Sequence, residues 1–299
     1  MAWQCVAQQQ VERSTNDANS FIWNPAMTSI NNYWEIGANY KQQWAGFEDA
    51  SRTITASVQY PFQGKNMSVG MFLLSDQTHP LLYNAVGFTY NYQLKLNLAK
   101  EDYLSIGILG SYGEYRIDMK DIITSVGEDP LTPVNESSTI IPNFGAGLFY
   151  TTNKDKFSSN TLYAGISASQ LFSSDLIFEG LERDVNLARV LHGNAIVGAT
   201  LLIERDLYFE PPIWVNYASQ NIFDLNVGAR VEKENIFWAG ANFTTSQTLS
   251  AQGGVILTNG VLQDGQLRIG GLATYHIGRL SSSLGVGYEF YIAYRFYNN

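Results

Sequence analysis

The chain has 299 residues, of which 45% are hydrophobic, 13% aromatic and only 15% charged. Soluble domains usually have about 25% charged residues, so this composition argues against a protein whose whole surface faces water. The formal net charge of −9 argues against nucleic-acid binding, which favours a basic stripe. No apolar run reaches the roughly 18 residues of a transmembrane helix. Many aromatic residues, 26 glycines and low charge instead favour a membrane β-barrel.

The first ten residues, MAWQCVAQQQ, resemble the end of a signal peptide without its charged and apolar beginning. Cys5-Val6-Ala7 before Gln8 provides the small residues that a signal peptidase reads, so residues 1–7 are interpreted as a remnant. The alternative is that Cys5 is lipidated, but the preceding Ala-Trp-Gln matches such a site poorly.

Residues 8–32 form an irregular, polar N-terminal segment that contains one apolar-aromatic knot, Phe21–Ala26. An exposed patch of this kind would lower solubility. We therefore expect the knot to plug the lumen of the barrel, with contact to a periplasmic partner as the alternative.

Residues 33–299 are expected to form a single barrel domain of about fourteen antiparallel strands. Each strand alternates apolar side chains with small or polar ones at a period of two, the pattern of a strand with one apolar face. The expected strands are Trp34–Gln43, Arg52–Phe62, Met67–Ser75, Ala85–Leu98, Tyr103–Ile117, Ile140–Thr151, Thr161–Leu171, Val190–Ile203, Leu207–Ala218, Ile222–Val231, Ile236–Thr244, Leu249–Leu257, Gln266–His276 and Leu284–Tyr297. Pro211-Pro212 removes two donors from its strand, so a bulge or a later start is expected there.

The last stretch, Leu284–Tyr297, shows the pattern best and must pair with Trp34–Gln43 to close the barrel. An even strand count places both termini on one side, which for this class is the periplasm. Aromatic residues near strand ends are expected to form the interfacial girdles: Tyr33, Trp34, Trp44, Tyr60, Tyr103, Tyr150 and Trp238.

The polar faces of these strands carry the charges that would line a lumen. These residues are Glu35, Lys41, Lys95, Asp224, Arg230, Arg268, Glu289 and Arg295. The alternative fold is a soluble β-sandwich, but sandwich strands are shorter and their outward faces should be charged.

No set of residues supports catalysis, a metal or a cofactor. His79, His192 and His276 stand in separate segments without companions at ligand spacing. Ser167 and Ser169 lack the second glycine of a nucleophile elbow. The glycines of Gly107–Gly110 and Gly285–Gly287 are expected on the inner face of their strands. Acids of the two long loops could hold calcium, although solvated loop charge is the simpler interpretation.

Several short segments resemble the PorP/SprF family of outer-membrane proteins of the type IX secretion system of Bacteroidota. Asn24-Pro25-Ala26, Tyr40–Glu48 and the segment from Arg52 resemble the family's opening signature. Ile141–Gly147, Leu162–Ser167, Phe237–Ala241 and Tyr288–Phe296 resemble later segments, in order and over nearly the whole chain. Lys41 and Tyr288 depart from residues common in the family. The family-motif residues are Asn24, Pro25, Trp44, Gly46, Phe47, Glu48, Arg52, Pro142, Asn143, Phe144, Gly145, Trp238, Gly240, Glu289 and Phe296.

The resemblance implies a non-enzymatic outer-membrane barrel that supports export or surface attachment of a secreted adhesin, in some members for gliding motility. It also implies periplasmic partners, namely the secretion ring and OmpA-like peptidoglycan-binding proteins, in addition to outer-membrane lipid. The links Trp44–Ser51, Asp118–Ser138 and Phe172–Asn186 would then face outward as cargo-contact candidates. A channel for small or hydrophobic solutes is the competing function, and a soluble binding module is the third.

Overall fold

The computed structural model describes residues 19–46, 49–79, 81–96, 98, 101–117, 137–157, 159–172, 175–176, 187–188, 190–218, 222–258, 265–277 and 285–296. Within these ranges, no helix is long and apolar enough to cross a membrane. Residues 1–18, which include the expected signal-peptide remnant, lie outside the described residues.

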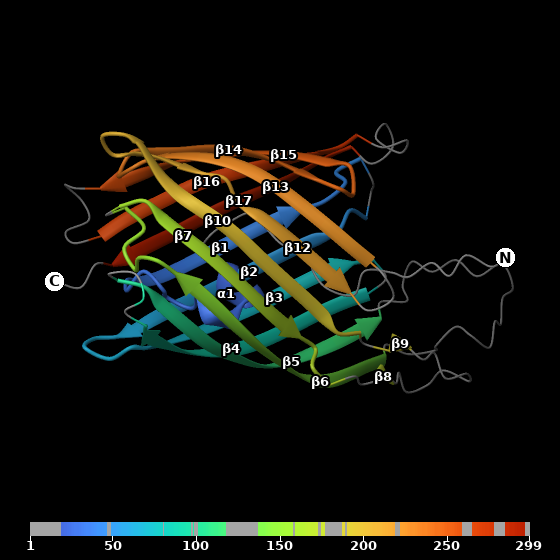
Figure 1. The fold of residues 1–299 in the computed structure, drawn as a ribbon. Helices are drawn as coiled ribbons and strands as arrows, with labels where there is room; N and C mark the ends of the chain where they lie inside the picture. Colours follow the sequence, from blue (N-terminus) through green and yellow to red (C-terminus); the bar gives the residue numbers. More distant parts are fainter. Residues whose placement is uncertain are drawn as a thin grey trace, which may run out of the picture.

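The described strands form a closed antiparallel barrel of fourteen strands (Figure 1). In chain order they are β1 (Trp34–Gln42), β2 (Arg52–Phe62), β3 (Met67–Thr78), β4 (Leu81–Lys95), β5 (Tyr103–Ile117), β6 (Ser137–Thr151), β7 (Thr161–Ser169), β10 (His192–Glu204), β11 (Leu207–Glu210) with β12 (Ile213–Ala218), β13 (Ile222–Lys233), β14 (Phe237–Thr244), β15 (Thr248–Thr258), β16 (Gly265–His276) and β17 (Val286–Phe296). A separate short ladder joins β8 (Asp175–Leu176) to β9 (Leu187–Ala188). The expected class and strand number are confirmed.

The barrel closes where the first strand meets the last. Strands β1 and β17 pair in one continuous register from Trp34 opposite Phe296 to Gln42 opposite Tyr288. We call the end of the barrel at Trp34 and Phe296 the terminal end; it lies on the left in Figure 1. Pairing of first and last strands leaves no sheet edge exposed.

Strands β11 and β12 are two parts of one strand, interrupted at Pro211 and Pro212. Both parts pair with β10 on one side and β13 on the other. The pairing Leu201 to Phe209 continues as Val197 to Ile213 without a change of register. The interruption therefore reflects the two missing proline donors and not an inserted residue.

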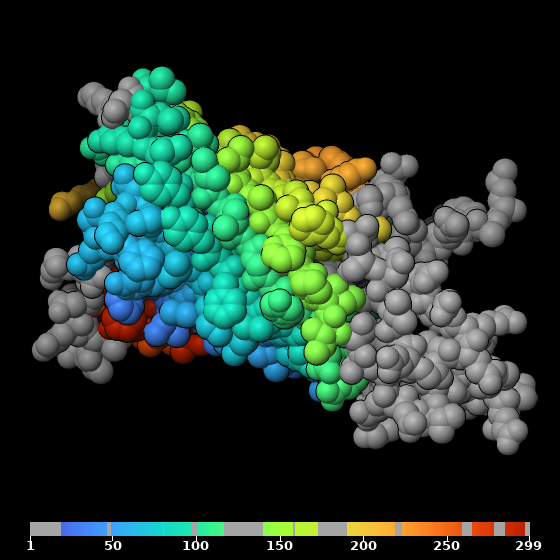
Figure 2. Space-filling model, turned by 90° about the horizontal axis from the view of Figure 1, so that it is seen from below, coloured from blue at the N-terminus to red at the C-terminus, as the bar shows by residue number. Residues whose placement is uncertain are grey.

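Alternation decides which side chains face outward. In β17 the side chains of Val286, Phe290 and Ile292 are exposed, whereas Glu289 and Arg295 are buried inside. Figure 2 shows the outer wall, where strands β3 to β7 follow one another in colour order. An apolar outer face with polar groups inside is the arrangement that lipid solvent requires.

Two expectations about facing direction are wrong. Tyr33 and Trp238 lie inside, where Arg295 stacks over the Tyr33 ring at 4.5 Å and Arg268 over the Trp238 ring at 4.7 Å. Gly110 faces outward, because it is an odd number of residues from the inward Gly107. Lys95 shares the face of β4 that carries the inward Thr89, Asn91 and Gln93, as expected, and it is exposed because β4 ends there.

Candidate functional site in the barrel lumen

The described part of the N-terminal segment folds into two short turns. The helix α1 (Ser20–Trp23) is followed by the 3-10 turn η2 (Pro25–Met27). Asn24 joins them, because its Oδ1 accepts a hydrogen bond from the backbone N of Ala26 at 3.0 Å. Proline at the first helical position needs no donor there, so Asn-Pro-Ala specifies this local fold.

The Asn24-Pro25-Ala26 turn lies directly on glycines of three neighbouring strands. A Cβ at Gly107 would lie 2.1 Å from the Ala26 backbone N, and one at Gly147 would lie 2.0 Å from Asn24 Oδ1. Asn24 Nδ2 also donates to the carbonyl oxygen of Leu148 at 3.1 Å. These contacts need strands without side chains at the inner face, so the glycines form a floor for the turn.

Hydrogen bonds fasten the segment to the wall on both sides of this floor. Ser167 Oγ donates to the carbonyl oxygen of Trp23 at 2.8 Å. Thr28 Oγ1 donates to Thr89 Oγ1 at 2.8 Å. The backbone N of Ser29 donates to Gln59 Oε1 at 2.7 Å. The segment is thereby bonded to β2, β4 and β7 as well as seated on the glycine floor.

Apolar packing completes the contact. Phe21, Ile22 and Trp23 are buried against inward-facing Phe72, Leu74 and Leu109, and Ala26 is buried against Phe149, Ile196 and Trp214. The inner wall therefore carries apolar patches among its polar residues along β3 to β12 and is not polar throughout, as the sequence pattern suggested. Burial of these side chains stabilises the seated segment by the ordinary hydrophobic effect.

The opposite part of the inner wall, from β13 round to β1, is charged. Glu232 is held by Arg230 at 2.6 Å and by Arg268 at 2.8 Å. Glu35 pairs with Arg295 across the closing strands β1 and β17. Buried charges persist only when they are paired, so cross-strand pairing explains how this wall can carry them.

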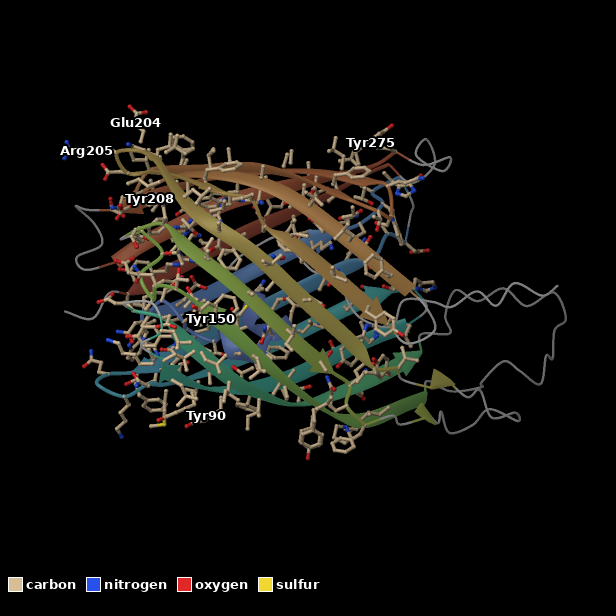
Figure 3. The ribbon with its side chains drawn as sticks, in the orientation of Figure 1. Tyr90, Tyr150, Glu204, Arg205, Tyr208 and Tyr275 are labelled. Atoms are coloured by element: carbon tan, nitrogen blue, oxygen red, sulfur yellow. The ribbon has the colours of Figure 1, made fainter. Side chains whose placement is uncertain are left out.

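Lys156, in the β6–β7 loop, extends this network to the terminal end through Glu210 at 2.6 Å. By contrast, Glu204 and Arg205 stand outside the barrel at the β10–β11 turn (Figure 3). Side chains of the terminal end thus divide into an enclosed, paired group and a solvent-facing group.

The first group of family-motif residues divides between two places. Asn24 and Pro25 form the seated turn, whereas Trp44 and Gly46 lie in the β1–β2 link at the other end of the barrel. The adjacent Ala45 N donates to the Val286 carbonyl oxygen at 3.2 Å. This contact ties the link to the start of β17. Arg52 is exposed; Phe47 and Glu48 lie outside the described residues.

The second group lies in β6. Pro142 and Phe144 face outward, and Phe144 packs edge-on against Phe172 at 5.5 Å. Asn143 Oδ1 accepts from the backbone N of Gln170 at 2.9 Å. Gly145 faces inward. These residues anchor the chain beyond β7 and do not touch the seated turn.

The last group belongs to the closing half of the barrel. A Cβ at Gly240 would lie 2.8 Å from the Ala229 carbonyl oxygen. Glu289 accepts a hydrogen bond from Asn39, and Phe296 packs against Trp34 at 6.3 Å. The motif residues therefore do not converge on one site.

Sequence reasoning placed Gly107 on the inner face but missed its role, and it missed the other residues that receive the turn, namely Gly147, Gly165, Ser167 and Thr89. Gly147 and Gly165 stand inside segments that carry the family resemblance, and an inward glycine in a strand signals a close approach of another backbone. That signal could have predicted a close backbone contact at these glycines, but not that the Asn24-Pro25-Ala26 turn makes it. Among the described residues, no cluster of three or more metal-ligating side chains occurs.

Comparison with known proteins gives the family. The model of the family described as "Type IX secretion system membrane protein PorP/SprF" matches residues 6–294. No curated protein matches the sequence.

Solved structures give the fold. The CymD monoaromatic hydrocarbon channel is 11% identical, with 94% of this chain and 93% of that chain covered and a TM-score of 0.56. The Ralstonia pickettii toluene transporter TbuX is 10% identical, with 95% and 94% covered and a TM-score of 0.53. At these identities the likeness concerns the fold alone, which is that of outer-membrane barrels. With nearly its whole length matched by the family model, the chain belongs to the PorP/SprF family of type IX secretion system membrane proteins.

Proposed function

We propose that this protein is a non-enzymatic barrel that supports export or surface attachment of a secreted adhesin by the type IX secretion system, including in gliding motility. The family supports a role in this system. The seating of Asn24-Pro25-Ala26 on Gly107 and Gly147 is the observation that carries the proposal. A lumen occupied by the chain's own segment suits a scaffold better than an open conduit.

In this proposal the N-terminal segment plugs the lumen and both termini face the periplasm of a Bacteroidota-like cell. The secretion ring and OmpA-like peptidoglycan-binding proteins would then approach the terminal end. The links 43–51, 118–136 and 170–191 would face outward and contact the adhesin. Loops on a rigid barrel are suited to such contacts because they tolerate change without loss of the scaffold.

The test is deletion of the gene in its host, followed by fractionation of the adhesin into medium, cell surface and periplasm. We expect the adhesin to disappear from the surface and medium in the deletion strain and to return with the full-length chain. A host protein exported by another route serves as the control. Normal surface adhesin in the deletion strain would contradict the proposal.

The second candidate function is a channel for small or hydrophobic solutes. Two structures with this fold are named as a hydrocarbon channel and a toluene transporter. The lumen also holds a cavity of about 170 Å³ at the terminal end. Growth of the deletion strain that is impaired only on particular solutes, with normal secretion, would favour this function.

A further inference from the structure

The cavity at the terminal end lies between the N-terminal segment, the β6–β7 loop and the charged wall. Its volume is about 170 Å³, whereas one water needs roughly 10–15 Å³ measured in this way. The space is therefore large enough for a small molecule or a ligand's head group.

Four cationic side chains line this cavity: Lys154, Lys156, Arg230 and Arg295. Three of them have carboxylate partners. Lys156 pairs with Glu210 at 2.6 Å and Arg230 pairs with Glu232 at 2.6 Å. Arg295 pairs with Glu35. Ion pairing within the wall accounts for these three cations.

Among the described residues, Lys154 differs from these three cations in having an aromatic neighbour instead of a carboxylate. Its Nζ lies 5.4 Å from the centre of the Tyr103 ring, and no carboxylate of the described residues lies at ion-pair distance from it. Asp155 beside it accepts a hydrogen bond from the Phe157 backbone N at 3.0 Å. Burial lowers the pKa of Lys154, because a desolvated ammonium lacks a compensating charge. An aromatic face compensates less than a carboxylate does.

Neutral polar side chains, Thr200 and Gln252 among them, line the same cavity, as do the carboxylates Glu35, Asp155 and Glu210. Oxyanions are commonly held by one cation together with neutral donors, since charge-assisted hydrogen bonds are the stronger ones.

We propose that this lumen cavity binds a compact oxyanion, either a carboxylate or a phosphate, with the Lys154 ammonium as its counter-ion. The anion would supply the negative charge that the wall lacks at Lys154. The inference stands independently of the role in secretion.

Isothermal titration calorimetry on the folded full-length chain in detergent tests the site, with sodium phosphate and sodium acetate as separate probes at matched ionic strength. The variant Lys154→Gln removes the charge and keeps a polar side chain that is one atom shorter. Lys154→Arg restores a cation. Lys65→Gln is the matched control, because Lys65 is an exposed lysine in the β2–β3 turn at the same end.

We expect saturable binding of at least one probe, about tenfold or more weaker in Lys154→Gln, and largely retained in Lys154→Arg and Lys65→Gln. Preference for phosphate or acetate then identifies the head group. Absence of heat with both probes, or equal binding by wild type and Lys154→Gln, would overturn the proposal. Heat-modifiable gel mobility of each variant establishes that the barrel is folded.

Discussion

Gly107 and Gly110 lie in the same strand, three residues apart, yet their surroundings differ completely. Gly107 faces inward under the Ala26 backbone, whereas a Cβ at the outward Gly110 would meet nothing within 4 Å. The backbone of Pro25 and Ala26 cannot rotate away as a flexible side chain would.

We therefore predict that Gly107→Ala lowers the free energy of unfolding by about 1–3 kcal/mol, the usual cost of overpacking. Gly110→Ala should leave it nearly unchanged. Guanidinium unfolding in detergent, followed by tryptophan fluorescence, measures both variants. Equal free energies of unfolding for the two variants would show that contact with the seated turn does not restrict the side chain at position 107.

Glu232 and Glu234 form a second pair of neighbours with opposite roles. Glu232 is a fully buried carboxylate held by Arg230 and Arg268. Glu234 lies just beyond β13, where burial, followed by the negative charges of Asp206 and Asp155, raises its pKa. A raised carboxyl pKa means that ionised Glu234 weakens folding above that pKa, and that this effect disappears as the pH falls.

We predict that Glu232→Gln lowers the free energy of unfolding by about 3–5 kcal/mol, because it leaves the buried cations Arg230 and Arg268 without their partner. Glu234→Gln should be neutral or slightly stabilising at neutral pH, and this gain should vanish in acid. The same unfolding titration at two pH values measures both. A stable Glu232→Gln barrel would mean that the buried arginines find other partners.

Among the elements, β17 closes the barrel by pairing with β1. Phe296 at its terminal end packs against Tyr294 at 4.3 Å and Trp34 at 6.3 Å. Phe290 in the middle of the same strand is a lipid-facing side chain that is 60% exposed. Substitution of Phe296 therefore tests the contact that closes the barrel, and substitution of Phe290 controls for the loss of a lipid-facing side chain.

We predict that Phe296→Ala lowers the fraction of assembled barrel, since it removes the aromatic contact with Trp34 at the terminal end of the closing pair. Phe290→Ala should assemble as the wild type does. Heat-modifiable mobility on gels and the yield in the membrane fraction measure assembly. Unchanged yield of Phe296→Ala would show this contact to be dispensable.

At the scale of the whole molecule, the lumen has two unlike halves. One wall holds the N-terminal segment through apolar patches and neutral hydrogen bonds, and a charged wall carries the ion pairs. If the segment stays seated, the barrel should pass little current, and locking the segment should change nothing. Thr28 Oγ1 and Thr89 Oγ1 are only 2.8 Å apart, so the two side chains point at each other, and these positions are chosen for an engineered disulfide.

We predict low conductance in planar bilayers for the wild type and for Thr28→Cys/Thr89→Cys in a Cys5→Ser background, whether oxidised or reduced. The double variant with alkylated cysteines controls for the substitutions themselves. Steady current that appears in the wild type, or only after reduction of the disulfide, would show that the segment moves aside and would favour the channel function.

The strand positions, the number of strands and the closing pair could all be predicted from the sequence. Alternation is local, and lipid outside the barrel imposes the same apolar face on every strand. The interruption at Pro211-Pro212 was also predictable, because proline lacks its donor wherever it stands. Residues 1–18 and most of the two long loops lie outside the described residues, so those expectations stay predictions.

Only the tertiary structure decided which inward residues meet. Glu35 and Arg295 are 260 residues apart, and their pairing exists only because β1 and β17 close the barrel in one register. Trp238 near a strand end suggested a girdle, but the parity of its strand turns it toward Arg268. Asn24-Pro25-Ala26 and the glycines beneath it come together for the same reason: contacts across a lumen depend on register and closure, which no local pattern records.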